Sequence, residues 1–151
     1  MKKYRTYSLM LLLFTQLSCQ KSDIELTSNY ETYVPSFTEK VQYKLQYGKW
    51  TYTIGTNLTL NKDATFDMTT CGNYIKGNWH IYADTLFLQY QDMSYRIDSL
   101  NYIKEWKDRL NTKHKIAYYL IKDKYLERGF IDAKNRYVLT KLVQVKTAEN
   151  Q

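Results

Sequence analysis

The sequence predicts an all-β fold, in which a single antiparallel meander closes into a barrel or a strongly curved sheet. Apolar and polar residues alternate with a period of two over most of residues 56–90, which is the spacing of successive side chains on a pleated strand. The 16 tyrosines favour half-buried sheet surfaces. A chain of 151 residues is long enough for one domain with its own core and short for two.

Four short segments between residues 56 and 90 carry this alternation. Lys62-Asp63 turns between the first two, which makes them a hairpin, and Cys71-Gly72-Asn73 and Ala83-Asp84 supply the next turns. One face of these strands is expected to be apolar and to carry Leu58, Leu60, Phe66, Met68, Ile75, Gly77, Trp79, Ile81, Leu86 and Leu88.

The first 18 residues have the pattern of a secretory signal peptide. Basic residues among the first five precede an apolar run over residues 9–14, which is too short to span a bilayer but typical of such a signal. Leu17-Ser18-Cys19 then resembles the end of the lipobox of bacterial lipoproteins, although Gln16 stands where a leucine is usual. The resemblance implies cleavage before Cys19 and acylation of its thiol, which would fasten the chain to a lipid bilayer.

The same resemblance places the protein in the cell envelope, at the outer membrane of a Gram-negative bacterium. The alternative is a plain secreted protein in which Cys19 is incidental. The formal charge of +7 would suit a nucleic-acid ligand, but loss of the three basic residues of the signal leaves 22 − 3 = 19 basic against 15 acidic residues, or +4. Because the chain is exported, we expect no nucleic-acid partner.

Residues 19–40 are polar, and their few apolar residues follow no period, so this segment is expected to be a tether. The stretch from Val41 to Leu45 alternates again and fits either a first strand or an extended arm. The β domain is therefore expected to span 41–146, followed by a frayed tail over 147–151.

Three motifs occur in an order that resembles the lipocalin-like domains of small Gram-negative lipoproteins: Gly48-Lys49-Trp50, Gly77-Asn78-Trp79 and the closing segment 136–142. The likeness covers about residues 47 to 145. It implies a small barrel in which Trp50 plugs one end and Arg136 reaches the face of its indole. The alternative for Arg136 is a surface position at the start of a strand.

The expected turns at 63–64, 83–84 and 123–124 depart from the pattern, because they lack the glycine that tight hairpins prefer.

The period changes once in the second half of the chain. Residues 93–100 alternate as a strand, but Ile103, Trp106 and Leu110 have helical spacing. This predicts one short helix near residues 102–110, or else a strand pair joined by a long polar loop. Strands are expected again at 116–121, 125–130 and 136–145.

No pattern for catalysis or metal binding stands out. The soft ligands Cys71, His80 and His114 lack the spacing of a closed metal site, and no nucleophile motif is present. We therefore expect no enzyme, no cofactor and no metal. If Cys19 is acylated, Cys71 is a free thiol, and such a cysteine is most commonly a small buried hydrophobic residue. If Cys19 is not acylated, a Cys19–Cys71 disulfide becomes possible.

Two functions remain, and both are binding. In the first, the barrel holds a small apolar or aromatic ligand, with Trp50, Phe66 and Trp79 lining or plugging it. In the second, the interior is packed and the domain is a protein-interaction module of the envelope. A cavity of several hundred Å³ would favour the first function. A filled interior with a contiguous exposed aromatic patch would favour the second.

Overall fold

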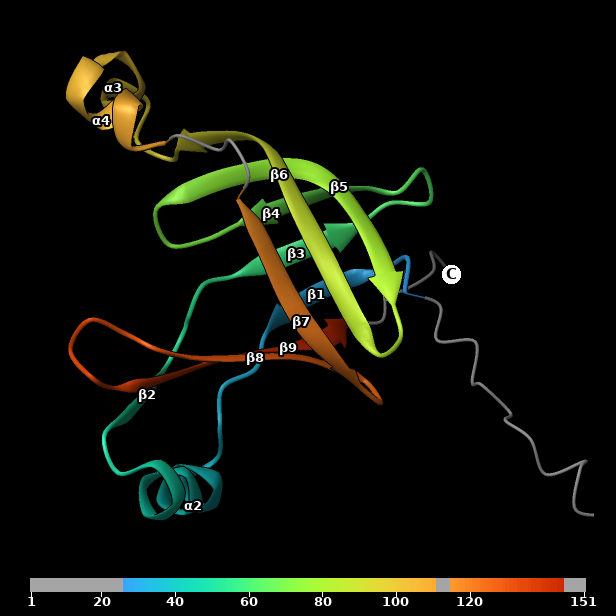
Figure 1. The fold of residues 1–151 in the computed structure, drawn as a ribbon, viewed down its shortest axis with the longest axis vertical. Coiled ribbons are helices and arrows are strands. Elements are labelled where there is room, and N and C mark those ends of the chain that lie inside the picture. The colour runs from blue at the N-terminus through green and yellow to red at the C-terminus, as the bar shows by residue number, and fades with distance from the viewer. Residues whose placement is uncertain (1–25, 111–114, 146–151) are drawn as a thin grey trace, which may run out of the picture.

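An eight-stranded antiparallel barrel forms the body of the protein (Figure 1). The structure is a computed structural model that describes residues 26–110 and 115–145. Its strands lie in the order β1-β3-β4-β5-β6-β7-β8-β9-β2, and the additional pairing of β1 with β9 closes the ring. The predicted all-β barrel is confirmed.

Seven consecutive strands make the meander that the sequence predicted. They are β3 (Asn57–Leu60), β4 (Thr65–Thr69), β5 (Asn73–Tyr82), β6 (Thr85–Tyr95), β7 (Ile116–Lys122), β8 (Tyr125–Ile131) and β9 (Tyr137–Val145). Each pairs antiparallel with the next.

The barrel is closed by β1 (Asn29–Thr32), which lies between β3 and β9. Tyr30 of this strand is opposite Leu58 on one side and Gln144 on the other, and its side chain is buried. The expectation of a tether over residues 19–40 is therefore wrong for this part of the chain. A strand of four residues is too short to produce a clear period, so only its two long-range partners define it.

Helix α2 (Phe37–Tyr47) follows where the sequence favoured a strand or an extended arm at Val41–Leu45, so that expectation is also wrong. Ser36 and Glu39 form a capping box that starts the helix, and Gly48 ends it with a φ of 66°. Strand β2 (Trp50–Tyr52) then runs parallel to the first part of β9, outside the barrel ring.

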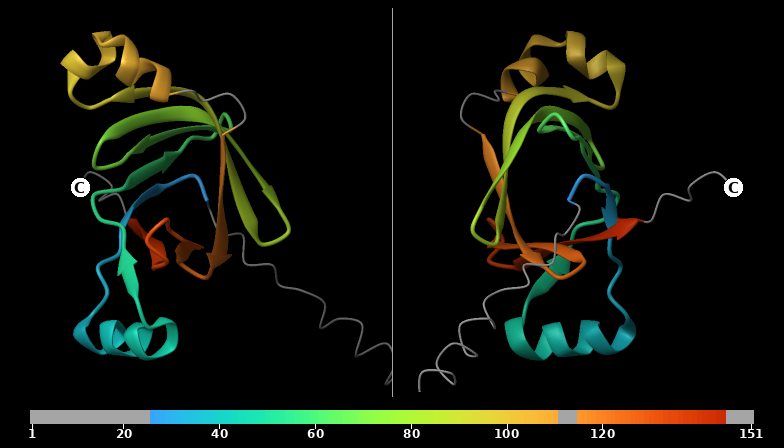
Figure 2. Two further views of the ribbon diagram at one scale, coloured as in Figure 1. Left: turned by 60° about the vertical axis from the view of Figure 1, so that its left-hand side comes forward. Right: turned by 90° about the vertical axis from the view of Figure 1, so that its right-hand side faces the viewer.

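Two short helices, α3 (Asp98–Tyr102) and α4 (Lys104–Arg109), confirm the predicted helical segment near residues 102–110. The strand expected at 93–100 is divided: its first residues extend β6 and its last residues begin α3. The α3–α4 pair and α2 lie at opposite ends of the molecule in Figure 1 and in both views of Figure 2.

The hairpin turns that lack glycine still adopt left-handed backbone conformations. The φ angle is 63° at Ala64, 51° at Ala83 and 48° at Asp123. Without glycine these turns still reach the left-handed backbone conformation, but each non-glycine residue is strained there by its Cβ.

Candidate functional site

The barrel interior is filled by side chains. The core cluster consists of buried residues from all eight barrel strands: Tyr30, Leu58, Leu60, Phe66, Met68, Ile75, Leu86, Leu88, Ala117, Tyr119, Leu126 and Leu142. Two grooves formed by described residues, one beside α2 and one between β6 and the α3–α4 pair, lie outside this core.

Two of the four candidate site residues belong to this interior. Phe66 is 1% exposed and is part of the core cluster. Trp79 is half-buried, packs against the cluster, and donates its Nε1–H to the backbone oxygen of Asn61 at 3.1 Å. Both are structural contacts of the packed interior.

Trp50 lies on the outer face of the barrel. It is opposite Tyr137 of β9, whereas Leu142 on the alternate face of that strand belongs to the core. Its ring lies 5.1 Å from Tyr43 of α2 and 5.9 Å from Tyr52. The expectation that this indole plugs the barrel is not met, because α2 covers it from outside.

Arg136 forms an ion pair and does not stack on Trp50. Its Nε and Nη2 donate to Oδ2 of Asp132 at 2.9 and 2.7 Å. Among the described residues no cation–π contact joins it to the indole. The alternative, a surface arginine at a strand start, describes its position.

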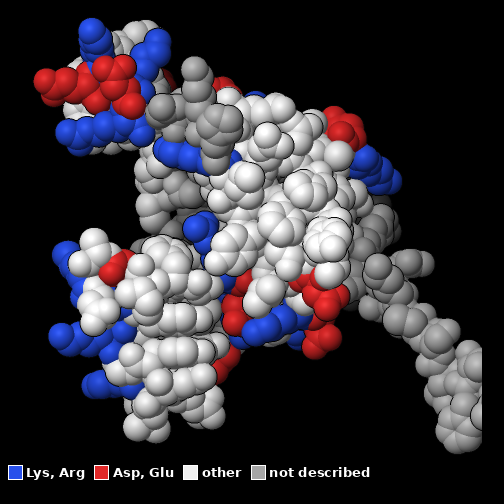
Figure 3. Space-filling view, in the orientation of Figure 1, with Lys and Arg blue, Asp and Glu red and all other residues white. Residues whose placement is uncertain are grey.

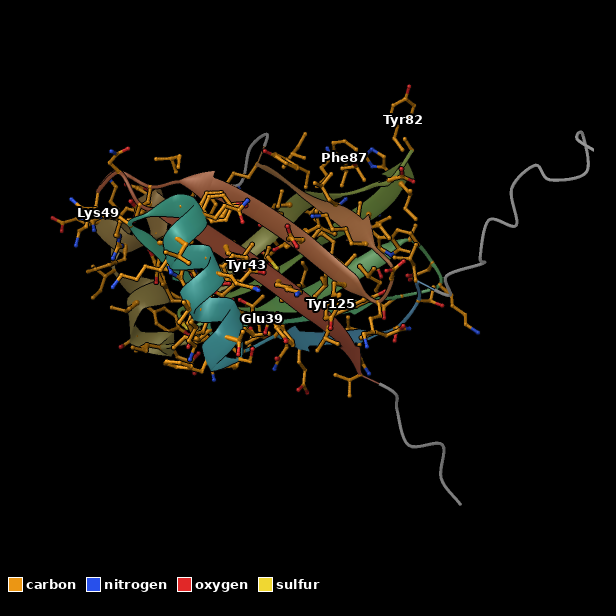
Figure 4. The ribbon with its side chains drawn as sticks, turned by 90° about the horizontal axis from the view of Figure 1, so that it is seen from below. Glu39, Tyr43, Lys49, Tyr82, Phe87 and Tyr125 are labelled. Carbon is orange, nitrogen blue, oxygen red and sulfur yellow. The ribbon has the colours of Figure 1, made fainter. Side chains whose placement is uncertain are left out.

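A network of charged and aromatic groups fastens α2 to the barrel. Lys141 of β9, whose side chain is 12% exposed, lies 3.6 Å from Oε1 of Glu39. Its Nζ is 4.4 and 4.1 Å from the ring centroids of Tyr33 and Tyr125. Figure 4 shows Glu39 and Tyr43 on the side of α2 that faces Tyr125.

Hydrogen bonds stabilise the ionised form of Glu39. The Ser36 backbone N–H donates to its Oε2 at 2.9 Å and the Tyr33 hydroxyl donates at 2.7 Å, and together they lower the pKa of Glu39 to about 2. The same hydrogen bond raises the pKa of the Tyr33 hydroxyl to about 12. These groups hold a helix in place and expose no reactive atom pair.

Near the β5–β6 turn, the outer face of β5, β6 and β7 is apolar where a barrel strand is commonly polar. Direct cross-strand pairs place His80 opposite Phe87, and Phe87 opposite Tyr118. The His80 and Phe87 rings are stacked with centroids 5.1 Å apart. We call the following set the outer aromatic face: His80, Tyr82, Phe87, Ile116, Tyr118 and Leu120.

This face is broad and carries few charges. Figure 3 shows a largely uncharged surface over β5, β6 and β7, and Figure 4 places Tyr82 and Phe87 on one side of the molecule, away from α2. Tyr82 is 76% exposed, and Ile116, Tyr118 and Leu120 are each about half exposed. Contiguous apolar surface of this kind marks contact sites.

The sequence carries a pattern that indicates this face, although the expected strand at 116–121 was predicted without it. Residues 116–121 are apolar throughout, Ile-Ala-Tyr-Tyr-Leu-Ile, although an antiparallel barrel strand needs only one apolar face. Ala117 and Tyr119 point into the core, so Ile116, Tyr118 and Leu120 must point outward.

Arg128 is a half-buried basic residue of β8 whose guanidinium lies beside a ring of the outer aromatic face. It is opposite Thr140, two residues from the core residue Leu126, and its guanidinium lies 5.8 and 5.3 Å from the ring centroids of Tyr118 and Phe130. Burial raises the pKa of Tyr119 to about 12, and Arg128, which hydrogen-bonds to it, acts in the opposite direction. No ion pair joins Arg128 to a described carboxylate.

The remaining chemical groups form no centre. Cys71 is exposed, not buried as expected, and its Sγ–H donates to the Ile54 backbone oxygen at 2.9 Å. Within residues 26–110 and 115–145 no group of three or more His, Cys, Asp or Glu side chains could hold a metal ion. His114 and Cys19 lie outside the described residues, as does the expected signal peptide.

No helix in the described part of the chain is long and apolar enough to cross a membrane. Neither a protein family model, nor a curated protein, nor a solved structure matches the chain.

Proposed function

We propose that this chain is a lipid-anchored envelope protein whose lipocalin-like barrel is a non-enzymatic protein-interaction module. The observation that carries the proposal is the outer aromatic face, where three rings and two further apolar side chains accompany His80 on the outside of three adjacent strands. Apolar surface in contact with water is unfavourable, and a partner protein that covered these side chains would remove it from water.

The packed interior supports an interaction module more than a carrier. The largest fully buried side chains, among them Phe66, Leu86 and Leu126, occupy the volume in which a carrier would hold its guest. The absence of a nucleophile motif from the sequence agrees with a binding role.

Site-specific photo-cross-linking in the native host tests the proposed surface. A photoreactive amino acid replaces Tyr82 or Tyr118 in the full chain, and the matched control replaces Tyr102, which is 87% exposed on α3. We expect a discrete heterologous product from positions 82 and 118, absent from position 102. The product should disappear when Leu120→Ser is added, because Leu120 lies on the same face.

A smear of equal intensity from all three positions, or no product, would refute the interaction surface. The anchor is tested separately by mass spectrometry of the membrane-fraction protein. We expect an N-terminal Cys19 carrying acyl chains, and an unmodified Met1 or a cysteine without lipid would exclude it.

Arg128 favours a second candidate, a small ligand with a carboxylate. A guanidinium flanked by aromatic rings and without a carboxylate partner among the described residues suits an anionic ligand with an apolar body. Octanoate should then raise the melting temperature, octanol should not, and Arg128→Leu should abolish the difference. Equal effects of acid and alcohol would eliminate this candidate.

A further inference from the structure

Helix α2 has apolar side chains on the side that faces away from the barrel. Glu39, Tyr43 and Tyr47 face the barrel and its appended strand β2. Phe37, Val41 and Leu45 recur at intervals of four on the other side, and Phe37 and Leu45 are 82% and 83% exposed. A surface helix ordinarily presents polar residues there, whereas Phe37 and Leu45 leave most of their apolar surface in solvent.

A shallow groove continues this row toward β2. It has a volume of about 420 Å³ and is lined by Phe37, Lys40, Val41, Lys44, Trp50, Thr51 and Tyr52. Lys40 extends over the Tyr52 ring, with Nζ 5.5 Å from the centroid. The α2 outer face, by which we mean Phe37, Val41 and Leu45, is thus bordered by lysines and by a tryptophan and a tyrosine.

The charge around this face is positive. Lys40, Lys44 and Lys49 have no ion-pair partner among the described residues. The acidic residue of α2, Glu39, is on the barrel side and engaged by Lys141. Figure 3 shows Lys and Arg side chains gathered along the edge of the molecule where α2, β2 and the β8–β9 turn lie.

We propose that the α2 outer face binds the anionic surface of a phospholipid bilayer. Phe37, Val41 and Leu45 enter the headgroup region, and Lys40, Lys44 and Lys49 lie among the phosphates, with their apolar stems along the interface. Exposed aromatic rings beside lysines are typical of proteins that lie on membranes. The charge argues against a second copy on this face, since two copies would bring the same lysines together.

The nearness of this face to a bilayer in the cell rests on the proposed lipid anchor. Leu26 follows Cys19 by seven residues, so an acylated Cys19 would hold the first described residue within about 25 Å of the bilayer. The contact itself is independent of the anchor. It would orient a tethered barrel with its α2 end toward the lipid.

Vesicle flotation of the purified chain from Gln20 to Gln151 tests the contact without any acyl chain. This chain contains every described strand and helix and the whole core cluster. We expect binding to vesicles of phosphatidylglycerol and phosphatidylcholine, none to phosphatidylcholine alone, and weakening by salt. Each of Lys40→Gln and Lys44→Gln should lower the affinity roughly fivefold. Phe37→Ser with Leu45→Ser should lower it about tenfold or more.

The matched control is at the other end of the molecule, where Lys104→Gln, Lys107→Gln and Tyr102→Ser remove exposed groups of the same kinds from α3 and α4. It should bind as the parent does, and all variants should keep the parent melting temperature. Equal binding to neutral and anionic vesicles, or equal loss in the control, would overturn the proposal. So would a dimer in sedimentation that Leu45→Ser abolishes. Since no protein partner is present, these results do not depend on the cross-linking outcome.

Discussion

Two alanines hold left-handed backbone conformations at hairpin turns, Ala64 with a φ of 63° and Ala83 with a φ of 51°. An L-residue other than glycine is strained there by its Cβ. We expect Ala64→Gly and Ala83→Gly each to raise the free energy of unfolding by about 0.5–1 kcal/mol in urea titrations.

The control for these two changes is Ala117→Gly, in the middle of β7 and 1% exposed. There the methyl group packs in the core and no positive φ favours glycine, so Ala117→Gly should lower the free energy of unfolding. A loss of stability in Ala64→Gly of the same size as in Ala117→Gly would contradict the argument from φ.

Gly77 is required by a close approach between strands. A Cβ at this position would overlap the backbone oxygen of Gln89 on β6 and lie 2.9 Å from Cε1 of Phe66. We expect Gly77→Ala to destabilise the barrel by about 1–3 kcal/mol or more, because neither a backbone oxygen nor a buried ring yields easily. Gly72→Ala, which meets nothing within 4 Å, is the matched control in thermal melts. Equal melting of the two variants would exclude the steric account.

At the scale of the element, the attachment of α2 depends on an ionised Glu39. Its pKa is lowered from 4.5 to about 2 by hydrogen bonds from the Ser36 backbone and the Tyr33 hydroxyl. A carboxyl whose pKa is lower in the folded state contributes stability above its unfolded pKa and loses it as the pH falls. The contribution of Glu39 should therefore be complete above about pH 4.5 and disappear toward pH 2.

Glu39→Gln should accordingly be less stable than the parent at neutral pH and should converge with it on acidification. Denaturant titrations across this pH range measure the effect. Glu105→Gln on α4 is a control that keeps the Glu39 network intact, and its curve should run parallel to that of the parent. A Glu39→Gln curve parallel to the parent would show that the network does not contribute.

The α2 segment also explains one failure of the sequence prediction. Residues 41–45 alternate apolar and polar, which suggests a strand, yet Ser36 and Glu39 form a capping box, which favours a helix. The tyrosines Tyr43 and Tyr47 then find ring partners in Trp50 and Tyr137. Tertiary contacts of this kind commonly override a local period.

At the scale of the whole molecule, β1 decides whether the barrel is closed. It pairs with both β3 and β9, and Tyr30 belongs to the core cluster. A chain that begins at Leu26 should fold cooperatively, whereas a chain that begins at Tyr33 should lose the closing strand and leave two open edges. Circular dichroism melts of the two chains measure this. Equal cooperativity would mean that the residues before Tyr33 act only as a tether.

The sequence by itself determined the strand order from β3 to β9, the helical segment before β7 and the inward placement of Phe66, since each follows from the spacing of neighbouring residues. It also contained the apolar run 116–121 that makes the outer aromatic face. Only the tertiary structure decided that β1 closes the ring and that Trp50 lies outside it, beneath α2. These features depend on pairs such as Tyr30 with Gln144 and Trp50 with Tyr137, whose members are far apart in the chain. A local pattern carries no information about which distant strand will complete a sheet edge, because that choice is made by burial and hydrogen bonding in the assembled fold.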